Sequence, residues 1–176
     1  MPAVEVTAST DAPLVTGADT IVSAVFEDEG VAADLPGGEL EAMLDRGEGA
    51  RTLGRVAVTH YESRRVLLVG LGPRSDFGFE SARVAAARVH ERARQIGTRR
   101  LCWELPSRVG AEIAEGLING TALADYRFTR YRPAPAGETP LSELIISADR
   151  DLSATVHRAA VLAAAQNRAR DLANAA

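Results

Sequence analysis

Metal and nucleophilic chemistry requires clustered histidines, cysteines, acids or activated serines, and this chain of 176 residues has few of them in suitable patterns. Its histidines, His60, His90 and His157, fall on three separate predicted elements, and no HxxxH or CxxC pair occurs. We expect His90, which follows Val89 on an amphipathic helix, to be a solvated or edge residue. No GxSxG motif surrounds a serine, although a triad can also assemble in space. The sequence therefore predicts no metal, no cofactor and no catalytic residue in this chain.

Lysine is absent, and all 20 basic residues are arginines. This composition excludes Schiff-base chemistry, a P-loop and a lysine general base. The single cysteine, Cys102, cannot form an internal disulfide, and its apolar neighbours Leu101 and Trp103 favour a buried small hydrophobe over a nucleophile. A net charge of −4 and a pI of about 5.4 argue against a protein whose main work is to neutralise nucleic-acid phosphates.

Two loops follow predicted strands at positions where α/β folds place their ligands. The run VLLVGLG contains Gly70 and Gly72 and precedes Pro73, which has no N–H, so the third glycine of a dinucleotide fingerprint is missing. We interpret this run as a tight strand exit. The acidic cluster EDE at residues 27–29 has no neighbouring electrophile, metal ligand or base, which indicates a solvated loop. The arginines of HERARQIGTRR are interpreted as a solvated helix face.

Alternating strands and helices must position these side chains. Apolar runs and period-2 alternation predict strands at residues 4–7, 20–26, 55–61, 64–72, 99–106 and 141–148, and helical spacing predicts helices at 39–45, 79–96, 111–124 and 153–176. This order predicts one three-layer α/β/α domain over residues 1–176, with a mixed, mostly parallel sheet. No apolar run approaches the ~20 residues that span a bilayer, so we expect a cytoplasmic protein without membrane contact.

The apolar positions of the terminal helix change sides along its length. At about 100° per residue, one face carries Val156, Ala159, Ala160 and Ala163, and the nearly opposite face carries Leu162, Ala165, Ala169, Leu172 and Ala173. In the second half, the first face continues with Asn167, Arg170, Asp171 and Asn174. We expect the first half to dock on this domain's own sheet. The second half should need an absent partner, without which it frays or packs against another copy.

Several segments occur in a characteristic succession: ADTIVSAVFED, VLLVGLG, FESARVAAARV, EGLINGTALADYRFTRYR, LSELIISA and a long helix that closes with RDLAN. Together they cover about residues 14–174 and resemble the N-terminal domain of the leucyl aminopeptidase (cytosol aminopeptidase) family. The resemblance implies a macro-domain-like α/β/α fold. It also implies a separate C-terminal domain, in which two divalent metals, manganese or zinc, serve the hydrolysis of N-terminal residues from peptides. The family's metal cluster, with its lysine, lies beyond RDLxN, so no catalytic residue can be carried over to this chain.

The leading hypothesis is a non-catalytic N-terminal domain that acts in assembly or regulation and is not an enzyme on its own. Residues 165–176 would form a connecting helix toward the C-terminal catalytic domain, and the resemblance implies a hexamer for the complete parent. The family usually continues RDLxN with Pro-Asn, where this chain has Ala175 and Ala176. Candidate interface residues are Tyr126, Phe128, Tyr131, Leu162, Ala169 and Leu172.

Two alternatives stay open. The aromatic and arginine string of Tyr126, Phe128, Arg130, Tyr131 and Arg132 fits an interface, because Tyr and Arg are enriched at hot spots. It fits equally well a helix exit that packs Phe128 and Tyr131 on the core. A free-standing macro-like module could instead bind ADP-ribose or another nucleotide, although Ser23, Ala24 and Val25 lie where that activity would call for an asparagine-rich loop. An arginine-lined nucleic-acid module is disfavoured by the acidic pI.

Overall fold

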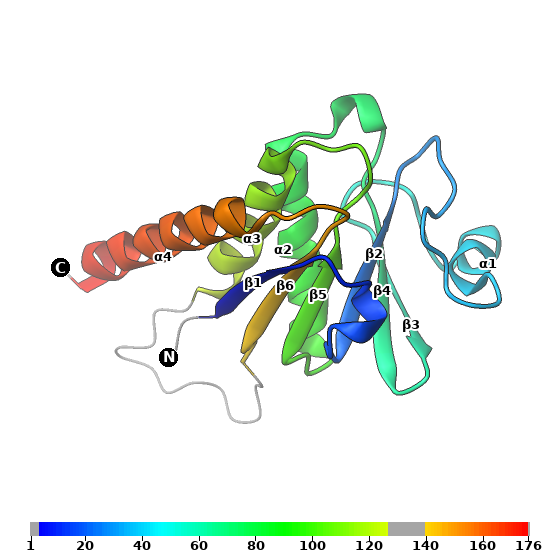
Figure 1. Cartoon of the computed structure of the whole chain (residues 1–176), viewed down its shortest axis with the longest axis horizontal. Helices are drawn as coiled ribbons and strands as arrows, with labels where there is room; N and C mark the ends of the chain where they lie inside the picture. The colour runs from blue at the N-terminus through cyan, green and yellow to red at the C-terminus, as the bar shows by residue number, and fades with distance from the viewer. Residues whose placement is uncertain (1–3, 127–139, 176) are drawn as a thin grey trace.

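Six strands form one mixed sheet in the order β1-β6-β5-β2-β4-β3 (Figure 1). The computed structural model describes residues 4–126 and 140–175. The strands are β1 (Glu5–Ser9), β2 (Thr20–Val25), β3 (Val56–Tyr61), β4 (Arg64–Gly70), β5 (Arg100–Glu104) and β6 (Glu143–Ser147). All neighbours pair in parallel except β3, which a two-residue hairpin places antiparallel to β4 at one edge. The carboxyl ends of the five parallel strands therefore share one edge of the sheet.

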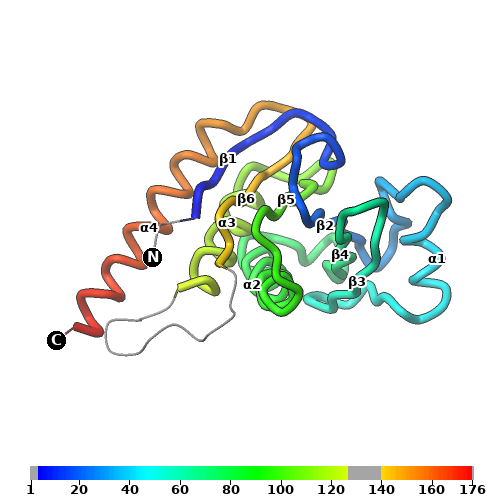
Figure 2. The backbone as a smooth tube through the Cα atoms, turned by 90° about the horizontal axis from the view of Figure 1, so that it is seen from below, coloured from blue at the N-terminus to red at the C-terminus, as the bar shows by residue number. Residues whose placement is uncertain are grey.

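Three long helices cover one face of this sheet, and a short helix and a turn lie on the other (Figures 1 and 2). The long helices are α2 (Phe79–Gln95), α3 (Ala111–Asp125) and α4 (Ser153–Ala175), and the other side carries α1 (Glu39–Asp45) and the 3-10 turn η1 (Pro13–Val15). Val22, Trp103 and Ile146 belong to the core beneath α2 and α3. Their strand neighbours Cys102 and Ile145 point to the opposite face. The expected three-layer architecture is confirmed, with a thin second layer.

Helices α2 and α3 approach each other through glycines of α3. A Cβ added at Gly116 would lie 2.5 Å from the carbonyl oxygen of Phe79, and one added at Gly120 would lie 2.2 Å from that of Arg83. Both distances are far below van der Waals contact, so the two backbones meet where only glycine fits. This close packing buries the alanine-rich face of α2, including Ala82.

The predicted elements agree with the structure in number, type and order over the described ranges. The predicted strand at 99–106 ends at Glu104 instead. The amide of Leu105 adds one more bond to Ser147, and the ladder stops at Pro106, which has no N–H. Two 3-10 turns, η1 and η2 (Arg74–Asp76), were not predicted, since their single-turn length gives no periodicity. Among the described residues, no helix combines the length and the apolar character that a membrane crossing demands.

Candidate functional site

The glycine-containing exit of β4 offers no amides to a phosphate. The backbone N–H groups of Gly70, Leu71 and Gly72 each donate to a carbonyl of a neighbouring segment. A Cβ at Gly70 would lie 2.3 Å from the carbonyl oxygen of Thr52, so glycine is required there for close approach of the chain. The interpretation of this segment as a tight strand exit is confirmed.

The acidic cluster after β2 divides into two parts. Glu27 and Asp28 are exposed, as expected of a solvated loop. Glu29 contradicts that expectation, because it is partly buried and forms a two-pronged ion pair with Arg74, whose Nη2 donates to Oε2 at 2.8 Å. The hydrogen bond from Arg74 lowers the pKa of Glu29. The pair ties the loop after β2 to η2.

The three histidines do not converge. His60 and His157 are exposed on β3 and α4. The expectation for His90 is wrong: its side chain is 3% exposed, because α3 covers that flank of α2, and its Nε2 lies 3.3 Å from Oδ1 of Asp125 without the alignment of a hydrogen bond. Within residues 4–126 and 140–175, no three His, Cys, Asp or Glu side chains are grouped so that they could hold a metal ion.

Cys102 is a buried core residue. Its side chain is fully buried with Ala18 and Ile145, and burial raises the pKa of the thiol to about 11. A thiol in this environment is a poor nucleophile, so the prediction of a small buried hydrophobe is confirmed.

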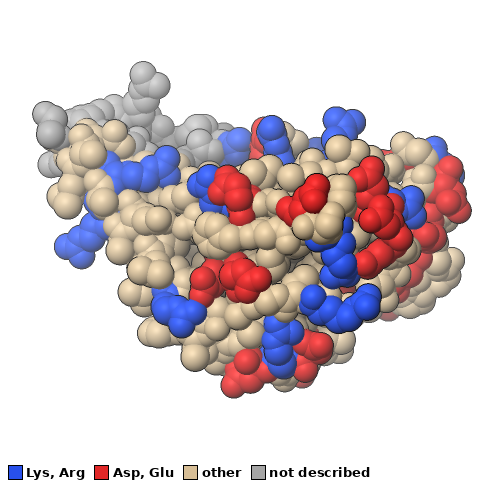
Figure 3. All heavy atoms as spheres, turned by 90° about the horizontal axis from the view of Figure 1, so that it is seen from above, with Lys and Arg blue, Asp and Glu red and all other residues tan. Residues whose placement is uncertain are grey.

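Arginine side chains do not gather into one basic surface on the face seen in Figure 3, where they are interspersed with acidic side chains. Arg100 of the HERARQIGTRR segment bonds Glu143 through its Nε at 2.6 Å, and Arg92 bonds Gln95 at 3.0 Å. These contacts are typical of a solvated surface with mixed charge.

The first half of α4 packs on the domain through Val156, Ala159 and Ala163, all at most 6% exposed. In the second half, polar side chains take over the same face and contact the end of α3. Nδ2 of Asn167 donates to the carbonyl of Ala122 at 2.9 Å, and Arg170 donates to the next carbonyl at 3.3 Å. These carbonyls belong to the last turn of α3, where backbone C=O groups find no N–H donor within their own helix.

Tyr126 completes this polar contact. Its hydroxyl donates to Oδ1 of Asp171 at 2.9 Å and accepts from Nδ2 of Asn174 at 3.3 Å. The guanidinium of Arg170 lies 4.4 Å from the centre of its ring. Tyr126 thus serves a contact within this chain, between the exit of α3 and α4.

The opposite side of α4 is apolar and open to solvent. Val161, Leu162 and Leu172 are 55%, 58% and 71% exposed. We call the exposed apolar residues on this side the α4 stripe: Val161, Leu162, Ala165, Ala169, Leu172 and Ala173. Figure 2 shows this part of α4 projecting past β1. Of the predicted interface residues, Leu162, Ala169 and Leu172 lie on the stripe, while Phe128 and Tyr131 lie outside the described residues. Val161 was missed, although its helical angle places it beside Leu172.

Residues 24–135 match the model of the "Cytosol aminopeptidase family, N-terminal domain". Because this match covers more than half of the chain, the chain belongs to the cytosol aminopeptidase family, as its N-terminal domain. The resemblance found in the sequence is confirmed.

The relatives are much longer proteins. A "Probable cytosol aminopeptidase" of Roseiflexus castenholzii is 29% identical over 96% of this chain and 36% of its own length, and one of Cenarchaeum symbiosum is 28% identical over 77% of this chain and 29% of its own. The chain thus spans about a third of the length of these curated relatives.

Solved structures of related proteins have the same fold over most of this chain. The bottromycin maturation enzyme BotP is 28% identical, with a TM-score of 0.70 over 90% of this chain and 33% of that one. A tomato leucine aminopeptidase mutant has a TM-score of 0.74 over 92% of this chain and 36% of that one, at 18% identity, which shows the fold alone. BotP has also been solved in complex with Mn.

Proposed function

We propose that this chain is a non-catalytic N-terminal domain that acts in the assembly or regulation of an aminopeptidase of its family. The parent enzyme would hydrolyse N-terminal residues from peptides, using two divalent metals, manganese or zinc, in a separate C-terminal domain. Family membership and the length of the relatives support this division, and the Mn complex of BotP supports a metal in related enzymes. The relatives are named cytosol aminopeptidases, which supports a cytoplasmic location.

The α4 stripe is the observation that carries the proposal. The second half of α4 presents polar side chains to its own domain and apolar side chains to water, the reverse of an ordinary amphipathic surface helix. Exposed apolar surface of this kind marks a docking site. The occupant proposed is the C-terminal catalytic domain of the same protein, with residues 165–176 as the connecting helix. A homo-oligomer, hexameric in a complete parent, would form around the catalytic domains.

An activity assay tests whether this chain is inactive without the proposed catalytic domain. The chain alone, with manganese or zinc, should release no product from leucine p-nitroanilide, because it holds neither lysine nor a metal cluster in its described part. A longer protein that joins this chain to the proposed C-terminal catalytic domain should be active. Metal-dependent turnover by the chain alone that disappears with a chelator would overturn the proposal.

A pair of variants in the extended protein tests the docking surface. Leu172→Glu should weaken assembly and activity, because it places a charge in an apolar contact. Val15→Glu is the matched control, since Val15 is 70% exposed but lies on η1, away from the stripe. Equal behaviour of the two variants in size-exclusion chromatography and in the assay would argue against docking through the stripe.

A further inference from the structure

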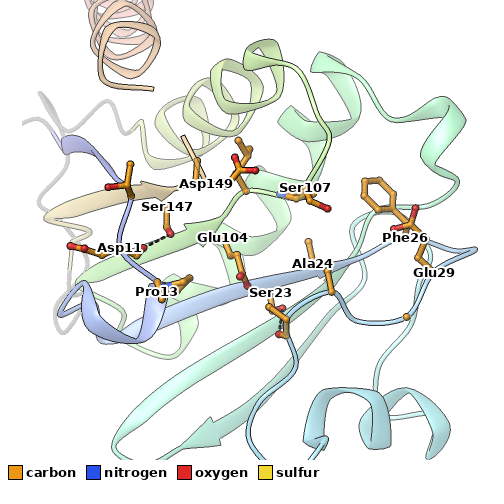
Figure 4. Close-up of a pocket in the computed structure, with 18 of the residues that line it drawn as sticks. Asp11, Pro13, Ser23, Ala24, Phe26, Glu29, Glu104, Ser107, Ser147 and Asp149 are labelled. Atoms are coloured by element: carbon orange, nitrogen blue, oxygen red, sulfur yellow. Dashed lines mark hydrogen bonds between the residues drawn. The ribbon is translucent and has the colours of Figure 1, made fainter. Parts of the chain in front are cut away.

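A cavity of about 430 Å³ opens at the carboxyl ends of β1, β6, β5 and β2, away from the α4 stripe. Its volume is within the roughly 300 to 1,000 Å³ of small-molecule pockets, and open α/β sheets bind their ligands at this edge. Pro13, Ala24 and Phe26 contribute apolar walls (Figure 4). Nothing in the proposed function uses this cavity.

Three polar side chains form a row across the cavity: Ser23 of β2, Glu104 of β5 and Ser147 of β6. Glu104 is the register partner of Ser147, and Trp103 pairs with Val22, the residue before Ser23. Because the register is shared and neighbouring strands lie about 4.8 Å apart, the three side chains project from the same face of the sheet in adjacent positions. Figure 4 shows Glu104 between the two serines.

The two serine hydroxyls of this row and two amides beside it already donate hydrogen bonds. Ser147 donates its hydroxyl proton to a backbone carbonyl at 2.7 Å, and Ser23 donates to another at 3.5 Å. The amides that follow β5 and β6, those of Leu105 and Ala148, are bonded to strand carbonyls. The row therefore presents acceptor oxygens, and a ligand that fits it must donate hydrogen bonds.

The charges of the lining residues also favour a ligand that donates hydrogen bonds and carries a positive charge. Asp11, Glu29, Glu104 and Asp149 line the cavity; Glu29 is paired with Arg74, the one cation among the lining residues, and Asp149 with Arg150 at 3.1 Å. Within the described residues, Asp11 and Glu104 are left without a cationic partner. Among the described residues, no ion pair or hydrogen bond reaches the carboxylate of Glu104. Burial raises its pKa, as expected of a carboxylate that lacks a compensating partner. Such a lining repels phosphates and attracts cations.

We propose that this cavity binds a small primary ammonium compound with an apolar substituent, whose –NH3+ group donates to Glu104 and to the hydroxyl oxygen of one flanking serine, Ser23 or Ser147. An ammonium carries donors only, which matches a row of acceptor side chains, and hydrogen bonds of about 2.9 Å let one nitrogen join Glu104 to a neighbouring serine. A metal ion fits less well, since the described residues offer no group of three metal-ligating side chains. The apolar substituent lies against Pro13 and Ala24.

Titration of the chain with L-valinamide, followed by backbone amide NMR, tests the proposal. L-valinamide should bind in the millimolar range or tighter and shift the amides at the ends of β2, β5 and β6. N-acetyl-L-valinamide, which has the same side chain without the charge, should bind at least about tenfold more weakly, because it loses a hydrogen bond between charged groups. Glu104→Gln should weaken L-valinamide binding by a similar factor.

Glu91→Gln is the matched control, because Glu91 is exposed on α2, on the other side of the sheet, and should leave binding unchanged. Absence of shifts in the wild-type chain, shifts confined to other segments, or equal binding of the acetylated compound would overturn the proposal whether or not the variant folds. Tighter binding of ADP-ribose than of L-valinamide would also overturn it, and would favour the nucleotide-binding alternative.

Discussion

Burial of the Glu104 carboxyl lowers the stability of the fold when the group is ionised, and the same carboxyl is the one that we propose binds an ammonium group. Burial raises its pKa in the folded chain above the value in the unfolded chain, so the folded state holds the proton more tightly. Folding stability must therefore fall as pH rises from the unfolded pKa through the folded pKa, because ionisation is costlier in the folded state. A residue kept at this cost is a candidate for function rather than for stability.

Glu104→Gln should consequently stabilise the fold at neutral pH. The amide stays neutral, so the melting temperature at pH 7 should rise, by roughly 2 to 4 °C for each kcal/mol of ionisation cost removed. Near pH 4 and below the gain should shrink, because the wild-type carboxyl is then protonated too. Thermal unfolding followed by circular dichroism at the two pH values measures this difference. A gain of equal size at both pH values would show that charge is not its cause.

The importance of this position could not be predicted from the sequence. Glu104 and Ser147 end the apolar runs RLCWE and ELIIS, and Ser23 interrupts the run TIVSAV, but the meeting of the three residues depends on the strand order. The predictions turned instead to the glycines at 70 and 72 and to the acidic cluster at 27–29, which stand out within a single segment. Adjacency across strands is a tertiary property and leaves no local pattern.

At the scale of elements, the close contact between α2 and α3 excludes any side chain at two glycines of α3, a restriction that the sequence of α3 alone does not reveal. Gly120→Ala adds a better helix former, which alone would stabilise α3 by about 1 kcal/mol. The added methyl would lie 2.2 Å from the carbonyl oxygen of Arg83, however, and must push the helices apart. We expect a net loss of about 1 to 3 kcal/mol in the free energy of unfolding, measured by urea denaturation.

Gly78→Ala is the control for this substitution, because a Cβ at Gly78 would meet nothing within 4 Å and its φ of −136° suits any residue. Its effect should be much smaller. If Gly120→Ala is as stable as the wild type, then the two helices can separate without cost and the close packing is not needed.

Helices and strands were predictable because each carries its periodicity within itself. The buried face of α2, which contains Ala82 and Ala85, follows the helical spacing of the sequence itself. His90 was misplaced because its burial depends on α3, which arrives from a distant part of the chain and covers that flank. The two-sided character of α4 was predictable for the same reason as the other helices, whereas the polar contacts that hold its second half required the position of Tyr126.

At the scale of the whole molecule, the proposed function makes α4 the point where this domain would meet a partner, in keeping with the family match and the greater length of the relatives. Its first half is anchored by buried apolar side chains, which water cannot replace. Its second half is held by side-chain hydrogen bonds on an otherwise exposed helix, and each such bond contributes only about 1 kcal/mol. The two halves should therefore differ in local stability.

Hydrogen exchange measured along α4 at low protein concentration should reveal this difference. Amides of residues 169–173 should exchange at least about tenfold faster than those of residues 159–163, because opening the second half exposes little new apolar surface. Raising the concentration, or attaching the catalytic domain, should slow exchange in the second half only, since covering the α4 stripe adds the burial that it lacks. Leu172→Glu should abolish that slowing, and Val15→Glu should not. Strong protection of residues 169–173 in the dilute monomer would instead mean that the contacts of Asn167 and Arg170 with α3 suffice to hold the helix, and the stripe would then need no partner for stability.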